Sequence, residues 1–179
     1  MKTVPLNRVF TISHGNKFDL NKMGKCATGP DAVAFVGRSA ESNGLTSFVD
    51  TVIGVEPFSQ GLITVALGGS ALSSFVQPRP FYTGQNIDVL IPIDPDMSLD
   101  VKFFYCLCIE ANRFRYSTFG REANRTLKTI LVPSLESVPS WVTGSTDNAI
   151  TDLCEALAEV TKAKPDAEIE VEDALSYER

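Results

Sequence analysis

The first 92 residues alternate short runs of β-forming apolar residues with glycine-containing turns, and this alternation constrains the fold more than any other feature. Apolar runs this short, bounded by turn residues, favour strands over helices. The sequence predicts strands at 32–36, 61–67, 75–77 and 87–91, and a strand or short helix between 4 and 12. Turns are expected at 14–17, 42–44 and 68–69. The front half of the chain should therefore be rich in β-structure.

After Pro95, apolar residues recur with helical rather than strand spacing. Ser98 is a suitable N-cap, and Asp100 follows in the first turn, where a carboxylate is favoured. We expect a helix whose apolar face contains Leu99, Phe103, Leu107 and Ala111, with Phe104 and Cys108 beside it. The sequence as a whole predicts a mixed, β-rich α+β fold with helices in its second half.

The last third of the chain divides into several short segments. A second, shorter helix is expected near Gly120, and a strand from Thr129 to Val132 ends at Pro133. A Pro/Ser-rich connector, residues 136–146, carries Trp141 and leads into an amphipathic helix at 147–162. Residues 163–179 are expected to form an acidic, flexible tail. The apolar stripe of the amphipathic helix consists of Ile150, Leu153, Cys154, Leu157 and Val160.

The net charge of −6 is unevenly distributed along the chain. Residues 146–179 hold ten acidic and three basic side chains, whereas the first 145 residues hold 12 acidic and 13 basic side chains. The acidity therefore belongs to the C-terminal segment, and the rest is near neutral. A simple nucleic-acid binder is usually strongly basic, so any contact with phosphates is expected to be shared with a partner.

Composition also limits which chemistry the chain can perform. The sequence has a single histidine and four cysteines without a Cys-x-x-Cys pair, so neither a zinc site nor any other cofactor site is expected. No apolar run is long enough to cross a bilayer, and the N-terminus lacks an apolar signal region. We expect free thiols, no membrane association and a cytoplasmic location.

Seven segments between residues 3 and 135 carry a family resemblance through their order and spacing. They are Val4–Phe10, Gly15–Met23, Phe35–Gly44, Gly61–Gly69, Phe81–Ile87, Arg113–Asn124 and Leu127–Pro133, with Phe81–Ile87 the sharpest match. Together they resemble the target-recognition domain of type I restriction-modification specificity subunits and of type IIG relatives. The resemblance implies that residues 1–135 read a sequence in double-stranded DNA without catalysing a reaction. Methyltransferase subunits, and possibly restriction subunits, would be its partners.

The chain departs from that family in two respects. It contains one recognition domain rather than two, and its C-terminal helix is shorter than the usual spacer. Two copies could pair through Ile150, Leu153, Leu157 and Val160, and two-fold pairing would imply a split palindromic site. Alternatively, this stripe packs on its own domain, because the apolar positions make a small interface.

The clearest cluster of basic residues lies in the second half of the chain, where it contains Arg113, Arg115, Tyr116, Arg121, Asn124, Arg125 and Lys128. The last four are spaced so that a helix would place them on one face. Arginine can pair with guanine and asparagine with adenine in the major groove. The same residues could equally form an ordinary solvated helix face. DNA reading by this cluster is thus a hypothesis that depends on the family resemblance.

Further candidates for DNA contact lie in the front half of the chain. One polar group surrounds Gly84 and comprises Gln77, Arg79, Tyr82, Gln85 and Asn86, which could instead be an ordinary turn. Another group follows a strand and comprises Arg38, Ser39 and Asn43. Lys17 is a candidate for phosphate contact, as Lys22 and Lys25 would be if they are more than plain surface residues.

Two rival functions also follow from the sequence. Asp96, Asp100 and Lys102 formally match a metal-dependent nuclease string, but their expected place at a helix start favours capping instead. No nucleophile–base pair, phosphate-binding loop or methyltransferase motif is present, so we expect no enzymatic activity. The second rival is a protein-interaction or inhibitory module whose acidic tail imitates DNA.

Overall fold

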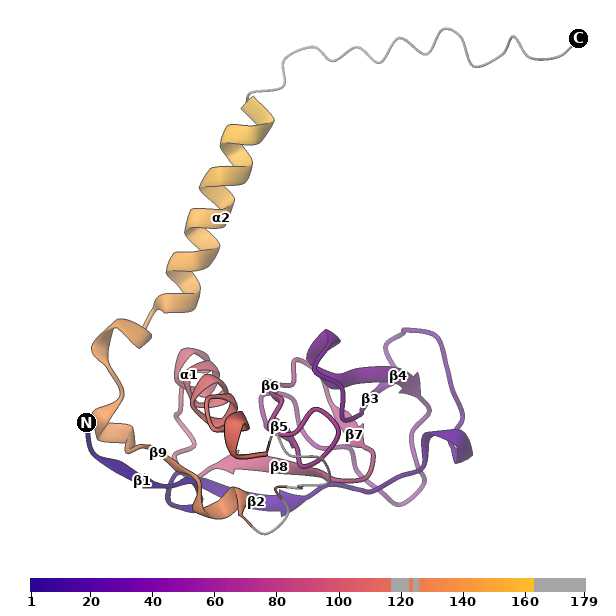
Figure 1. Cartoon of the computed structure of the whole chain (residues 1–179). Coiled ribbons are helices and arrows are strands. Elements are labelled where there is room, and N and C mark those ends of the chain that lie inside the picture. The colour runs from indigo at the N-terminus through magenta and orange to yellow at the C-terminus, as the bar shows by residue number, and fades with distance from the viewer. Residues whose placement is uncertain (117–122, 124–125, 163–179) are drawn as a thin grey trace, which may run out of the picture. The chain divides into compact units, whose positions relative to one another are not determined.

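The computed structural model describes residues 1–116, 123 and 126–162, and the side chains up to residue 157. The chain forms two compact units, residues 1–143 and residues 144–179. Among the described residues, the first unit contains nine strands and the helix α1, and the second contains the helix α2 (Figure 1). The predicted mixed, β-rich α+β class is confirmed.

The largest sheet is antiparallel, with the strand order β2–β8–β5–β6. Its strands are β2 (Phe10–His14), β8 (Ile87–Pro92), β5 (Ile63–Ala66) and β6 (Ser74–Val76). All four residues of β5 are buried, as expected for an inner strand covered on both faces. The main hydrophobic core includes Phe10, Ile63, Leu90 and Tyr105, so α1 and this sheet share one core.

A second sheet has the order β4–β3–β7, in which β3 and β4 are antiparallel and β3 and β7 are parallel. These strands are β4 (Leu45–Val49), β3 (Val33–Val36) and β7 (Phe81–Thr83). A short connection at 84–86 leads from β7 into β8, and therefore joins the two sheets (Figure 1). The remaining pair, β1 (Thr3–Pro5) and β9 (Leu131–Pro133), brings the start of the unit against residues 131–133.

Helix α1 (Leu99–Glu110) begins as predicted, because the Ser98 hydroxyl accepts a hydrogen bond from the Val101 amide. Its predicted apolar face is wrong. Leu99, Phe103 and Leu107 are exposed, whereas the buried side chains are Tyr105, Cys106 and Ile109. Nine of the twelve residues in α1 are apolar, so their spacing does not distinguish the face that meets the sheet.

Other segments agree only in part with the elements predicted from the sequence. Strands β4 and β7 were not among those predicted, and between residues 4 and 12 both a strand and a 3₁₀ turn occur. The connector contains two 3₁₀ turns, at Leu135–Ser137 and Ser140–Val142, and the second buries Val142. Helix α2 spans Ser145–Lys162, two residues more than predicted. The predicted tail, 163–179, lies outside the described residues.

Candidate nucleic-acid interface

The β5–β6 loop, residues 67–73, connects several of the candidate residues. The Ser70 amide donates to the carbonyl of Arg38, and the Leu67 amide donates to the carbonyl of Asn86 (3.2 and 2.9 Å). The Ala123 amide in turn donates to the Leu67 carbonyl at 2.8 Å. The loop thus brings together Arg38, Asn86 and Ala123, although they lie far apart in the sequence.

Arg113 joins the same loop through its side chain. Its Nε donates to the Ala71 carbonyl at 3.0 Å, and a terminal guanidinium nitrogen donates to the Ser73 hydroxyl at 2.6 Å. Glu110, one turn earlier, lies 3.9 Å from the same guanidinium. Arg113 therefore fixes the end of α1 against the β5–β6 loop, with two of its five N–H donors bound inside the protein.

The group at Arg38, Ser39 and Asn43 lies in the connection between β3 and β4. Arg38 and Asn43 are exposed, while the Ser39 hydroxyl accepts a hydrogen bond from the Glu41 amide. Asn43 adopts a left-handed backbone (φ 55°), which asparagine tolerates better than most residues. Arg38 and Asn43 are thus presented to solvent from a turn that is held by its own hydrogen bonds.

Two candidates from the predicted polar group around Gly84 lie inside the protein instead. Gln77 is 3% exposed, and its amide nitrogen donates to the Asn43 carbonyl and to the Thr64 hydroxyl. Tyr82 is fully buried; its hydroxyl accepts from the Val52 amide and donates to the Val55 carbonyl. Neither side chain can reach a ligand in this conformation, so both are omitted from the candidate surface.

The exposed members of that group are separated by strand β7. Arg79 precedes the strand and lies 5.7 Å from the centre of the Phe48 ring, whereas Gln85 follows the strand. Six residues at strand spacing correspond to roughly 20 Å. Because β7 runs parallel to β3, Gln85 lies at the end of the strand pair that leads into Arg38, and Arg79 lies at the other end.

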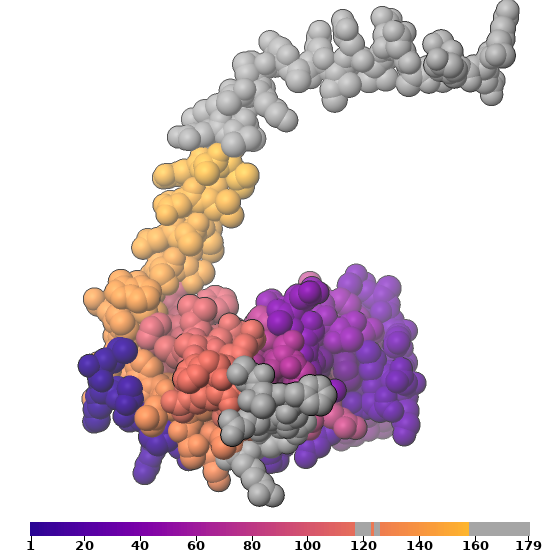
Figure 2. Space-filling model, in the orientation of Figure 1, coloured from indigo at the N-terminus to yellow at the C-terminus, as the bar shows by residue number. Residues whose placement is uncertain are grey.

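The structure describes only part of the basic cluster that the sequence places between Arg113 and Lys128. Arg115 is exposed beside the Phe114 ring, and the Tyr116 hydroxyl lies 2.5 Å from that of Thr126. This contact brings residues 113–116 and 126–129 together on one face of the first unit (Figure 2). Lys128 is exposed on the 3₁₀ turn Leu127–Thr129. Arg121, Asn124 and Arg125, and with them the predicted shared helix face, lie outside the described residues.

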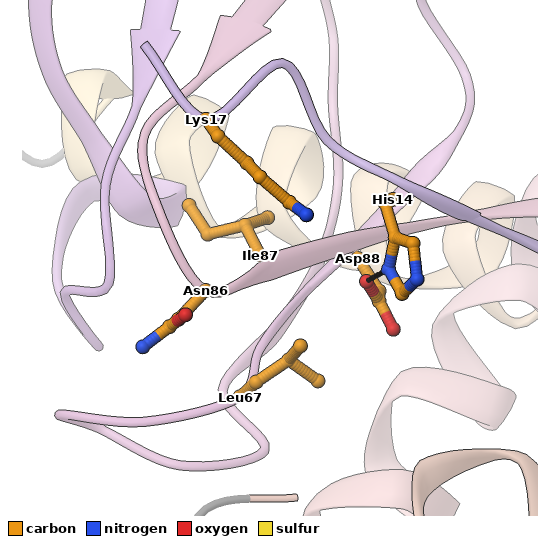
Figure 3. A pocket seen from close by; sticks show the side chains of 6 residues that line it. All are labelled: His14, Lys17, Leu67, Asn86, Ile87 and Asp88. Carbon is orange, nitrogen blue, oxygen red and sulfur yellow. Dashed lines mark hydrogen bonds and ion pairs between the residues drawn. The ribbon is translucent and has the colours of Figure 1, made fainter. Parts of the chain in front are cut away.

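Lys17 lines a hollow of about 220 Å³ together with Asn86, another candidate, and with His14 and Asp88, which were not candidates (Figure 3). The exposed ring of His14, on β2, places its Nδ1 2.8 Å from a carboxylate oxygen of Asp88 on β8. Asp88 is almost fully buried and lies between Ile87 and Val89 in an otherwise apolar strand. That isolated acidic residue was the available sequence signal, but the pairing of β2 with β8 was needed to locate its partner.

The other candidates for chemical reactivity are the nuclease-like string and the four cysteines. Asp100 and Lys102 lie in the first turn of α1, as expected for capping residues rather than for a nuclease site on a strand. Cys26, Cys106, Cys108 and Cys154 are free thiols, and burial raises the pKa of Cys106 to about 12. Within the described ranges, no three His, Cys, Asp or Glu side chains gather as a metal site would require. Neither of the two described helices has the length and apolarity of a membrane span.

The stripe on α2 carries large apolar side chains. Ile150, Leu153 and Leu157 are each more than half exposed, and the Val160 side chain is outside those described.

Solved structures with a similar fold come from type I restriction-modification systems. An S subunit from M. genitalium has 17% identity and a TM-score of 0.59, with 90% of this chain and 41% of that chain covered. A protein from a study of assembly and conformational transition of the type I system has 17% identity, a TM-score of 0.60 and coverages of 89% and 41%. The HsdS subunit from Thermoanaerobacter tengcongensis has 15% identity, a TM-score of 0.55 and coverages of 92% and 40%.

These likenesses show a shared fold, and this chain spans about two fifths of the length of each of the three proteins. No curated protein sequence matches the chain. The sequence model of the type I restriction modification DNA specificity domain matches residues 1–135, which are three quarters of the chain and nearly all of the first unit. The chain therefore belongs to the type I restriction modification DNA specificity domain family.

Proposed function

We propose that residues 1–135 recognise a specific sequence in double-stranded DNA and that this chain has no catalytic activity. The observation that carries the proposal is the convergence on the β5–β6 loop. This loop is hydrogen-bonded to the backbones of Arg38, Asn86 and Ala123. Arg38 carries a guanidinium and Asn86 an amide, the groups that read base edges, so two candidate residues flank one loop of a DNA specificity domain.

Within this proposal the candidate residues have different roles. Base contacts are assigned to Arg38, Asn43, Gln85, Asn86, Arg121 and Asn124, which carry guanidinium or amide groups. Phosphate or sugar contacts are assigned to Lys17, Ser39, Arg115, Tyr116, Arg125 and Lys128. Gln77, Tyr82 and Arg113 are assigned structural roles because their polar groups bind other parts of the protein. Arg79 is left out because it lies at the opposite end of β7 from Gln85.

Methyl transfer and cleavage would belong to modification and restriction subunits that bind this chain. We propose further that two copies pair through Ile150, Leu153, Leu157 and Val160 on α2. The exposure of the first three supports this, because apolar side chains at helical spacing favour a helical partner. A light-scattering measurement should give the mass of a dimer for the wild type and of a monomer for Leu153→Glu. Equal masses would exclude pairing through this stripe.

DNA recognition is tested by selecting from a pool of randomised duplexes with the full chain and with two arginine variants. Arg38→Ala and Arg79→Ala each remove one exposed guanidinium, but from opposite ends of the β3–β7 pair. We expect the wild type and Arg79→Ala to enrich the same sequence, and Arg38→Ala to relax the choice at one or more positions. Each lost base contact should cost about 1–3 kcal/mol of discrimination.

Two results would contradict the proposal. A full chain without salt-dependent affinity for any duplex would exclude DNA recognition by this protein alone. Equal loss of site choice in the Arg38 and Arg79 variants would refute the placement of the interface at the β5–β6 loop.

A further inference from the structure

The hollow beside His14 contains the almost fully buried carboxylate of Asp88, which is hydrogen-bonded to the exposed imidazole ring of His14. The Asp88 side chain is 4% exposed, whereas that of His14 is 71% exposed. Because the carboxylate accepts the hydrogen bond from His14 Nδ1, the other ring nitrogen, Nε2, faces away from Asp88. The buried carboxylate thus orients the ring.

Lys17 supplies a second cation at the same hollow. Figure 3 shows its side chain extending over Ile87 toward the His14–Asp88 pair. Among the described residues, His14, Asp88 and Lys17 are the charged side chains that line this hollow, together with Leu67, Asn86 and Ile87. When His14 is protonated, these three side chains carry two positive charges and one negative charge, which favours an anion.

The backbone around Lys17 is held in a conformation that is costly for lysine. Lys17 (φ 60°) and Asn86 (φ 56°) both adopt left-handed backbones, and both line the hollow. The turn is held by hydrogen bonds from the Gly15 amide to the Ile87 carbonyl and from the Phe18 amide to the Thr83 carbonyl. Strained residues that the surroundings hold in place concentrate at functional sites. Their coincidence at one hollow is a second observation that points to binding.

We propose that this hollow binds one phosphodiester group of the DNA backbone, with His14 Nε2 and Lys17 Nζ as the donors and Asp88 as a positioning residue. The inference rests on the proposed DNA recognition. The hollow lies next to the proposed interface, because Leu67 lines it and also accepts the hydrogen bond from Ala123. Protonated imidazole and ammonium are suitable partners for a phosphate oxygen, and such contacts position a protein without reading sequence.

The test measures binding of the full chain to the selected duplex and to a random duplex at several salt concentrations. His14→Gln and Lys17→Asn should each weaken both complexes about fivefold and reduce the salt slope by about one. Asparagine is used at position 17 because it tolerates the left-handed backbone. Lys2→Asn removes the same charge from an exposed residue just before β1 and should leave affinity unchanged.

The outcomes separate this inference from the proposed function. If the wild type binds duplex DNA but His14→Gln and Lys17→Asn behave like Lys2→Asn, the phosphate site is refuted and DNA recognition stands. If either variant weakens only the selected duplex, the contact is to a base and the phosphate assignment is wrong. Absence of binding by the wild type refutes both. Asp88→Asn should weaken both complexes, because the variant removes the carboxylate that orients the His14 ring, but the two exposed positions decide the case even if that variant does not fold.

Discussion

Replacing Gln77 by methionine separates a structural role from a DNA-reading role. Gln77 is 3% exposed and forms two hydrogen bonds through one nitrogen, at 2.8 Å to the Thr64 hydroxyl and 2.9 Å to the Asn43 carbonyl. A typical hydrogen bond contributes about 1 kcal/mol, and methionine keeps the length and flexibility of the side chain. Gln77→Met should therefore lower the free energy of unfolding by about 2 kcal/mol, which is about a thirtyfold change in the unfolding equilibrium.

A urea titration of the first unit's unfolding would measure this change, and a double mutant would identify its cause. Thr64 is itself buried, so Thr64→Val combined with Gln77→Met removes both partners of the inner hydrogen bond. Each single variant leaves the other partner of this hydrogen bond unpaired, whereas the double variant removes both partners. The double variant should therefore lose less stability than the sum of the two single variants. A Gln77→Met protein with wild-type stability but altered site choice would refute the structural assignment and restore Gln77 as a DNA reader.

Three other perturbations test the structure around the proposed interface. Arg113→Ala should lower stability by about 1–2 kcal/mol through loss of its bonds to the β5–β6 loop, whereas Lys128→Ala, at an exposed residue of a 3₁₀ turn, should change stability little; equal effects in urea titrations would contradict this. Gly15→Ala would place a methyl group against the Thr83 hydroxyl and 2.9 Å from the Ile87 carbonyl, so it should lower the free energy of unfolding by about 1–3 kcal/mol. Gly29→Ala is the control, because its methyl group would meet no atom within 4 Å. Burial raises the pKa of Cys106 from 9.0 to about 12, so the folded state favours the neutral thiol. The contribution of this thiol to the free energy of unfolding is complete below pH 9.0 and is lost as pH rises toward 12. Cys106→Ala should reduce the fall in unfolding free energy just above pH 9.0, before Tyr105 titrates in the unfolded chain; an unchanged pH profile would exclude this contribution.

Local sequence predicted the elements whose signals lie within a few residues. Ser98 marks the start of α1 because a capping hydroxyl needs only the amide three residues later. The short apolar runs that became β3, β5, β6 and β8 are bounded by turns, so their positions follow from local preferences. By contrast, β7 was missed because its three residues carry no alternating pattern, and only its pairing with β3 makes it a strand.

The candidate site shows the same division between local and long-range information. The sequence by itself determined the family, the strand-rich fold class, and which side chains have the chemistry to contact DNA. Tertiary structure decided which of them face solvent: Gln77 and Tyr82 are buried, and Arg113 is bound to the β5–β6 loop. It also paired His14 with Asp88, 74 residues away. The physical reason is that composition and spacing act within a few residues, whereas burial and hydrogen-bond partners depend on strand pairing between distant segments.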